Sequence, residues 1–182
     1  MKRISLLLVI AIGPMMLMAQ KTKKKATAPT QTIVQETTPK ETPPPYKKTL
    51  MIPKFEMRNI IDSSLFTNAN LDKSKRTIFI YFGPECGHCT VFTKKMMDSL
   101  DLFKNTQIIM VSSFGFDKIK KFYEDNKIAS CPFITMGQDK DYFFISHYGI
   151  RQFPSAYVYN KAGKFVKAYT SEINIFELAA EK

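Results

Sequence analysis

The stretch that most constrains the fold is YFGPECGHCT, residues 81–90, because it holds two of the chain's three cysteines at the junction of two different patterns. Before it, RTIFIYF (76–82) is a short apolar run rich in Ile, Phe and Tyr, which is typical of a strand buried on both faces. After it, apolar side chains recur at helical spacing at Phe92, Met96, Leu100 and Phe103. We therefore predict a buried strand, a turn that carries the cysteines, and a helix beginning at or near Cys86.

The pattern of strand and helix then repeats. QIIMVSS (107–113) predicts a second buried strand, and FDKIKKFYEDNKI (116–128) predicts a second amphipathic helix. Alternation of strands and helices of this length implies parallel strands joined by crossovers, which defines an α/β fold.

The C-terminal third follows a different pattern. SAYVYNKAGKFVKAYT (155–170) has two β-rich runs around NKAG, where Gly163 can adopt a positive φ, so we predict an antiparallel hairpin. EINIFELAAEK (172–182) predicts a closing helix. Between these parts, PFITM and DYFFISHYGI allow a short strand and a helix without requiring them.

The N-terminus has the order of a secretory signal. Residues 1–19 carry Lys2 and Arg3, then an apolar run, then Ala19, and the run is shorter than the ~20 residues that a membrane-spanning helix needs. We predict a signal peptide, with an uncleaved N-terminal anchor as the alternative. Either way the remainder is exported, and we place it in the periplasm, free or tethered to the membrane.

Residues 20–50 are rich in Thr, Lys and Pro and nearly free of large apolar side chains, so we predict a disordered linker there and a folded domain over residues 51–182. Of the net charge of +11, residues 1–19 carry +2 and residues 20–50 carry +5, which leaves +4 for the domain. Because the domain shows no basic stripe, we do not expect it to bind nucleic acid.

Several roles for the cysteine pair can be compared. Attachment of a c-type haem needs His directly after C-x-x-C, and Thr90 stands there. A structural zinc site needs four ligands, and besides the pair the chain offers only Cys131, His88 and His147. A purely structural disulfide is also disfavoured, since so short a loop constrains the unfolded chain little. We therefore predict no metal and no cofactor at this site.

A redox-active dithiol fits the context. A strand that runs into GPECGHC and then into a helix places Cys86 at the helix N-terminus, where unpaired N–H groups and the helix dipole favour thiolate over thiol. We expect Cys89, one turn further along, to be the more buried partner that resolves a mixed disulfide. His88 lies between the two cysteines and is predicted to tune them.

The order of these motifs resembles the thioredoxin superfamily. Strand, CGHC and helix, followed by a βα unit, FPSAYVYNKAGKFVKAYT and a final helix, are similar over roughly residues 54–182 to exported TlpA/ResA-type thiol-disulfide oxidoreductases, including thioredoxin-like proteins of Bacteroidetes-type bacteria. The resemblance implies a central mixed β-sheet with helices on both faces and a C-terminal β-hairpin plus helix. It also implies that Pro154 is a cis-proline beside the cysteines and that Phe153 offers main-chain groups to an extended substrate.

Two positions depart from the pattern of many thioredoxins. Glu85 stands where they have Trp, and Ile80, six residues before Cys86, stands where they bury an acid that assists proton transfer. Deprotonation of Cys89 would then need water or Glu85. The GH dipeptide is the one found in protein disulfide isomerase, which is more oxidising than thioredoxin. The direction of electron flow therefore stays open.

Our interpretation is an exported thiol-disulfide oxidoreductase, an enzyme that acts as a monomer on protein thiols and disulfides together with a membrane or periplasmic redox partner. The alternative is a thioredoxin-fold binding module in which the cysteine pair is vestigial or binds copper transiently. Cys131 is interpreted as a small core side chain, and His147 as a structural or exposed residue.

Overall fold

A seven-stranded mixed sheet organises the protein in this computed structural model, which describes residues 42–170 and 172–181. The strands are β1 (Glu56–Asn59), β2 (Leu65–Thr67), β3 (Arg76–Tyr81), β4 (Thr106–Ser112), β5 (Ile134–Gln138), β6 (Ser155–Tyr159) and β7 (Phe165–Tyr169). The α-helices are α1 (Gly87–Met97), α2 (Phe116–Asp125), α3 (Phe143–Tyr148) and α4 (Ile175–Ala180). Short 3₁₀ helices are η1 (Pro45–Lys47), η2 (Asn68–Asn70), η3 (Leu100–Phe103) and η4 (Ile128–Ser130).

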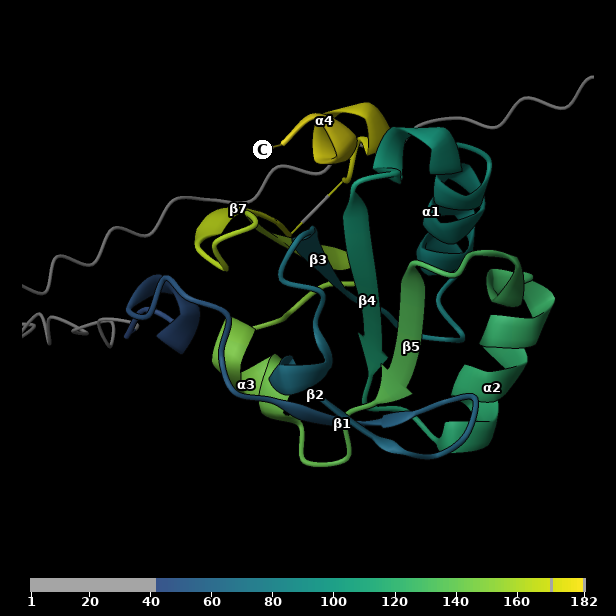
Figure 1. Cartoon of the computed structure of the whole chain (residues 1–182). Coiled ribbons are helices and arrows are strands. Elements are labelled where there is room, and N and C mark those ends of the chain that lie inside the picture. The colour runs from purple at the N-terminus through teal and green to yellow at the C-terminus, as the bar shows by residue number, and fades with distance from the viewer. Residues whose placement is uncertain (1–41, 171, 182) are drawn as a thin grey trace, which may run out of the picture. The chain divides into compact units, whose positions relative to one another are not determined.

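The sheet has the strand order β2-β1-β5-β4-β3-β6-β7, with the three parallel strands at its centre (Figure 1). β3 pairs in parallel with β4, and β4 in parallel with β5, as the alternating pattern predicts. β6 and β7 form the predicted antiparallel hairpin, and Gly163 in its turn has a φ of 72°. The predicted thioredoxin-like α/β fold is confirmed by this topology and by the structural comparisons reported below.

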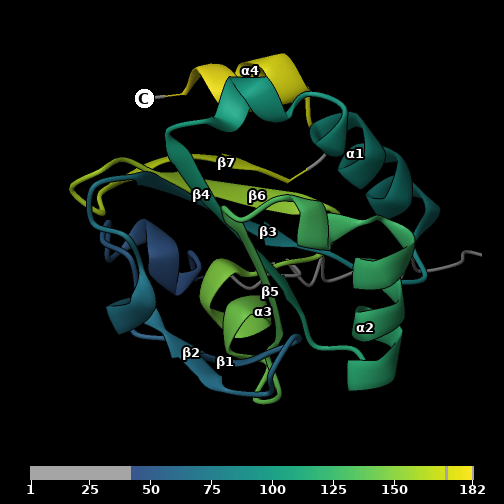
Figure 2. The same ribbon diagram turned by 45° about the vertical axis from the view of Figure 1, so that its right-hand side comes forward.

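Successive side chains of β3 point to opposite faces and divide the core in two. Ile78 and Ile80 belong to an apolar cluster with side chains of α1, α2 and α4, which we call the apolar face. Phe79 and Tyr81 belong to a cluster rich in rings that includes α3, which we call the aromatic face. Figure 2 shows α1 and α2 on one side of the sheet and α3 on the other.

Helix α1 is shorter than the predicted apolar stripe. It ends at Met97, with Asp98 as the C-cap, and Leu100 and Phe103 fall in η3 instead. Phe103 is nevertheless fully buried, so the stripe correctly identifies core residues but not a single helix. α2 likewise ends at Asp125, because Lys127 adopts a left-handed conformation with a φ of 52°.

The predicted linker over residues 20–50 extends too far. η1 lies within it, and its Tyr46 ring is only 6% exposed, packed against Tyr148, Tyr157 and Phe165. The main chain then runs beside β7, with Phe165 N–H donating to the Leu50 carbonyl and Ile52 N–H donating to the Gly163 carbonyl. One buried aromatic ring and these hydrogen bonds are sufficient to order a segment whose composition is otherwise that of a spacer. We call residues 42–52 the N-terminal strap.

The predicted signal peptide or anchor, residues 1–19, and the linker up to residue 41 lie outside the described residues. Within the part of the chain that the structure describes, no helix has the length and apolar character needed to cross a membrane.

Candidate active site

Cys86 lies at the N-terminus of α1, as predicted. It is the N-cap residue, with an extended backbone (φ −90°, ψ 115°), and its side chain is half-buried. The sequence folds this way because Gly83-Pro84 ends the apolar run of β3, while the helical pattern resumes directly after the first cysteine. Cys86 therefore occupies the N-terminal end of a helix, a position where the free N–H groups and the helix dipole favour a negative charge.

Cys89 lies behind Cys86 in the apolar face and is fully buried. Burial, reinforced by a hydrogen bond with the Cys86 side chain, raises the pKa of the Cys89 thiol to about 12, and the Gly83 N–H opposes this by donating to its sulfur over 3.4 Å. Both cysteines are in the free thiol form. The pair thus has one partly exposed cysteine and one buried cysteine whose raised pKa favours the protonated thiol.

The loop before β6 closes over the cysteines. The Phe153–Pro154 peptide bond is cis, and the Cys86 thiol donates to the Phe153 carbonyl oxygen over 3.8 Å. Gly83 permits this close approach, since a Cβ there would lie 3.3 Å from both the Cys86 Cβ and the Phe153 ring. The predicted cis geometry of Pro154 is confirmed, and so is the position of its loop beside Cys86.

Sequence reasoning missed two features around the pair. Phe114, in the loop between β4 and α2, is 36% exposed and packs edge to face on the Phe153 ring, with the ring centroids 6.2 Å apart. Lys118, in α2, forms a 2.7 Å ion pair with Glu85. Both residues come from a different crossover, about 30 positions away in the chain, so no local pattern around CGHC could have identified them.

The remaining candidate residues lie in different surroundings. His88 is exposed in the first turn of α1. Ile80 is fully buried in the same cluster as Cys89, so the position where many thioredoxins bury an acid is apolar here. Glu85, offered by the sequence as a proton acceptor, pairs instead with Lys118 on the surface.

Cys131 and His147 are more than 40 positions from the pair in the sequence, and only Cys131 shares the apolar face with Cys89. Cys131 is 3% exposed, and burial raises the pKa of its thiol. His147 belongs to α3 and stacks on Phe143, with burial lowering the pKa of its imidazole. Among residues 42–170 and 172–181, no three His, Cys, Asp or Glu side chains gather as a metal site would require.

Comparisons with known proteins identify the fold. No protein-family model matches the chain, and no curated protein matches its sequence. Solved structures do match. A secreted Mycobacterium tuberculosis disulfide oxidoreductase homologous to E. coli DsbE aligns at 14% identity over 69% of this chain and 91% of its own, with a TM-score of 0.58.

Two further solved structures also align with the chain. The peroxidoxin BcpB of Mycobacterium tuberculosis aligns at 14% identity over 71% of this chain and 90% of its own, with a TM-score of 0.60. The exposed lipoprotein thioredoxin Etrx1 of Streptococcus pneumoniae aligns at 18% identity over 68% of this chain and 93% of its own, with a TM-score of 0.52. At such identities the likeness shows the fold alone, which is thioredoxin-like.

Proposed function

We propose that the protein is a thiol-disulfide oxidoreductase that exchanges disulfides with protein substrates through Cys86 and Cys89. The observation that carries this proposal is the asymmetry of the pair: Cys86 is half-exposed at a helix N-terminus, and Cys89 is buried directly behind it. Several solved structures with this fold are disulfide oxidoreductases or thioredoxins by name, which supports the same chemistry.

In the reducing direction, the Cys86 thiolate attacks one sulfur of the substrate disulfide. A bond forms between Cys86 Sγ and that sulfur, the substrate S–S bond breaks, and the other substrate sulfur leaves as a thiolate. Cys89 then attacks Cys86 Sγ, which forms the Cys86–Cys89 disulfide and releases the second substrate thiolate. Two electrons pass from the protein dithiol to the substrate, and the reverse sequence oxidises a substrate dithiol.

The proton of Cys89 must leave before the second attack. Ile80 supplies no acid or base, and the Glu85 carboxylate is held by Lys118. The first substrate thiolate, released beside the pair, is a base that the reaction itself generates. We infer that it takes the Cys89 proton, so that resolution needs no buried carboxylate of the protein.

Trapping variants test the proposed function. With Cys89→Ala, a protein disulfide should accumulate as a stable mixed disulfide on Cys86, visible as an adduct in a non-reducing gel and by intact mass. Cys86→Ala should give no adduct, and Cys131→Ala should turn over insulin like the wild type. Equal trapping by the Cys86 and Cys89 variants, or no turnover by the wild-type protein, would remove the assignment and favour the binding-module alternative.

We also propose that His88 makes the couple more oxidising by stabilising the Cys86 thiolate, in line with the isomerase-like GH dipeptide. His88 is exposed at the start of α1, where proline is tolerated, so His88→Pro should fold normally. The variant should lower the reduction potential by tens of millivolts, where ~30 mV is about 1.4 kcal/mol for a two-electron couple. Unchanged potentials in glutathione equilibration would show that His88 does not tune the couple.

Export, the possible membrane tether and the narrower likeness to TlpA/ResA-type proteins belong to the proposal as well. They rest on the order of residues 1–19 and on the thioredoxin-fold structures described as secreted or as an exposed lipoprotein. Cell fractionation with intact-mass measurement tests them: a mature chain starting after Ala19 indicates cleavage, and a full-length chain in the membrane fraction indicates an anchor.

A further inference from the structure

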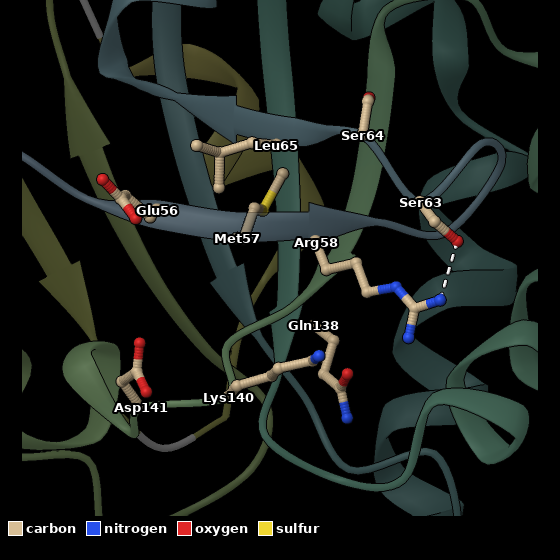
Figure 3. Close-up of a pocket in the computed structure, with 9 residues that line it drawn as sticks. All are labelled: Glu56, Met57, Arg58, Ser63, Ser64, Leu65, Gln138, Lys140 and Asp141. Carbon is tan, nitrogen blue, oxygen red and sulfur yellow. Dashed lines mark hydrogen bonds between the residues drawn. The ribbon is translucent and has the colours of Figure 1, made fainter.

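We propose that a pocket between the β1–β2 hairpin and the segment after β5 binds an extended stretch of the partner polypeptide that flanks its reacting cysteine. The inference rests on the proposed function and extends it to the class of ligand. The pocket has a volume of about 300 Å³, and Figure 3 shows side chains from both sides of it. The lining residues that the argument uses are Glu56, Arg58, Leu65, Gln138, Lys140 and Asp141.

The pocket and the cysteines lie at the same end of the sheet, where the parallel strands have their C-terminal ends. β3, β4 and β5 are parallel, Tyr81 is level with Val111, and Ser112 is level with Gln138. The residues that follow these strands, including Cys86 and Lys140, therefore lie at the C-terminal end of the sheet. Open α/β sheets bind their ligands at this end.

A chain of contacts connects the two places. Cys86 Sγ lies 3.8 Å from the Phe153 carbonyl oxygen, and the Phe153 ring packs on Phe114. The Phe114 carbonyl oxygen in turn accepts from Gln138 Nε2 over 2.9 Å. Phe114 is 36% exposed, so part of its surface is open to a polypeptide that passes between the two places. We assign about five extended residues, at ~3.3 Å each, to this passage.

The pocket offers main-chain and amide hydrogen-bonding groups that suit an extended polypeptide. β1 extends beyond the end of β5. Only Arg58 and Asn59 of β1 pair with β5, so Glu56 lies past the last paired residue of that strand. The Ile60 N–H donates to the Met136 carbonyl, so the main-chain groups of Ile60 point toward β5. Because the direction alternates along a strand, the N–H and carbonyl of Glu56 point to that side too. They face the space beyond the end of β5. Such an open strand edge is a place where a peptide can add by main-chain hydrogen bonds.

Two side chains of the pocket support the binding of a peptide. Gln138 Oε1 is buried and has no hydrogen-bond partner among the residues that the structure describes. A buried acceptor of this kind is costly unless a donor reaches it, and a peptide N–H is such a donor. The Arg58 guanidinium is held in place over the Phe116 ring, 3.9 Å from its centroid, and by a hydrogen bond to Ser63, shown dashed in Figure 3.

The charges of the pocket indicate which ligand fits. Glu56 and Asp141 oppose Arg58 and Lys140, so the formal charges of the lining side chains balance. A phosphate or a divalent cation would meet as much repulsion as attraction there, whereas the dipolar amides of a peptide can satisfy both signs. The exposed Leu65 side chain adds an apolar wall for a substrate side chain.

Site-directed crosslinking tests the proposal. A Cys89→Ala protein is loaded with a twelve-residue peptide that carries one activated cysteine and, five positions before or after it, a photoreactive phenylalanine analogue. Mass spectrometry of the irradiated adduct should place crosslinks in residues 56–65 or 138–141 for one of the two peptides. Crosslinks confined to other surfaces for both peptides would overturn the pocket assignment. Failure to form the adduct on Cys86 would instead contradict the proposed function.

A matched pair of variants gives a second test. Leu65 and Ile61 are both exposed apolar residues of the β1–β2 hairpin, at 61% and 70%, but only Leu65 lines the pocket. The ratio of kcat/KM on a twelve-residue disulfide peptide to that on a minimal disulfide should fall roughly fivefold in Leu65→Lys, as for the loss of one moderate contact. In Ile61→Lys the ratio should match the wild type. Equal ratios in both variants would contradict the proposal.

Discussion

The two faces of the sheet differ in what they bury. The apolar face contains mainly aliphatic side chains, with Cys89 and Cys131 among them. The aromatic face contains five tyrosines, at positions 46, 81, 148, 157 and 159, together with Phe55, Phe79 and Phe144. Three of these hydroxyls are hydrogen-bonded: those of Tyr148 and Tyr159 lie 2.9 Å apart, and the Ser113 N–H donates to that of Tyr81.

This difference separates the proposed chemistry, on the apolar face, from the ring packing of the aromatic face. On the apolar face the sulfur of Cys89 is buried among apolar side chains, and this burial is the largest cause of its raised pKa. On the aromatic face, ring packing and the N-terminal strap hold the sheet and α3 together. Substitutions in the aromatic face should therefore change the free energy of unfolding, and substitutions of the buried cysteine should change turnover.

The largest effect is expected at Phe79, in the centre of the aromatic face. Its ring packs against Phe55, Phe144, Tyr148 and Tyr159, with centroids 5.2 to 6.3 Å away. Phe79→Ala should lower the free energy of unfolding by about 3–5 kcal/mol, because it removes a buried ring and leaves a cavity. Urea unfolding measures the loss. The control is Phe176→Ala, at a site 71% exposed, where a change within ~0.5 kcal/mol is expected. Similar values for both would refute the central role of this face.

The N-terminal strap gives the second largest effect. Tyr46→Ala removes a ring that is 6% exposed and packed on three others, and it should cost about 2–3 kcal/mol of unfolding free energy. Insulin reduction at 20 °C should stay at the wild-type rate, since Tyr46 belongs to the opposite face from Cys89. Tyr142→Ala, 56% exposed, is the matched control. A strap variant that loses turnover while remaining folded would show that the two faces are coupled.

Local patterns were enough to predict the centre of the fold. The runs at 76–82 and 107–113 are mostly apolar because β3 and β4 are buried on both faces. Such continuous apolar runs identify buried strands directly. The N-terminal third was different. β1 and β2 lie near the sheet edge with mixed exposure, and the pattern of residues 51–75 is correspondingly weak. Tyr46 is a lone aromatic residue in a Pro- and Lys-rich segment, and only its tertiary contacts reveal it as core.

The site divides in the same way. Cys86 and Cys89 are predictable because strand, turn and helix are contiguous in the sequence. The position of Phe153–Pro154 came from the resemblance to thioredoxins, since the residues are more than 60 positions from Cys89 and carry no local signal of their own. Phe114 and Lys118 could not be predicted, because the crossover from β4 to α2 brings them to Phe153 and Glu85 only in the folded chain.

The buried thiol of Cys89 also makes the stability of the apolar face depend on pH. Burial raises the pKa of Cys89 from 9.0 to about 12, so above pH 9 the folded reduced protein keeps a proton that the unfolded chain has lost. This contribution is fully present below pH 9 and is lost as pH rises toward 12. Between pH 8 and 10 the reduced protein should lose about 1 kcal/mol from this group.

The oxidised protein is the matched control for that prediction. It lacks the Cys89 thiol but retains Tyr148 and Tyr159, whose pKa values are also raised by burial and which weaken both forms alike at high pH. Urea midpoints at pH 8, 9 and 10 should therefore decline more steeply for the reduced form than for the oxidised form. Parallel declines would mean that Cys89 is better solvated than its position indicates.

The smallest effect is expected at Cys131, which shares the apolar face with Cys89. It is 3% exposed at the end of η4, and burial raises the pKa of its thiol, so it should react slowly with disulfides. Cys131→Ala should cost about 1 kcal/mol of unfolding free energy, the amount typical of a small buried truncation. Its rate of insulin reduction should equal that of the wild type, whereas Cys89→Ala, an equally small truncation in the same face, should lose turnover. Loss of turnover in Cys131→Ala at normal stability would identify Cys131 as a third redox-active cysteine. The position of a buried thiol relative to Cys86 would then not explain which thiol takes part in disulfide exchange.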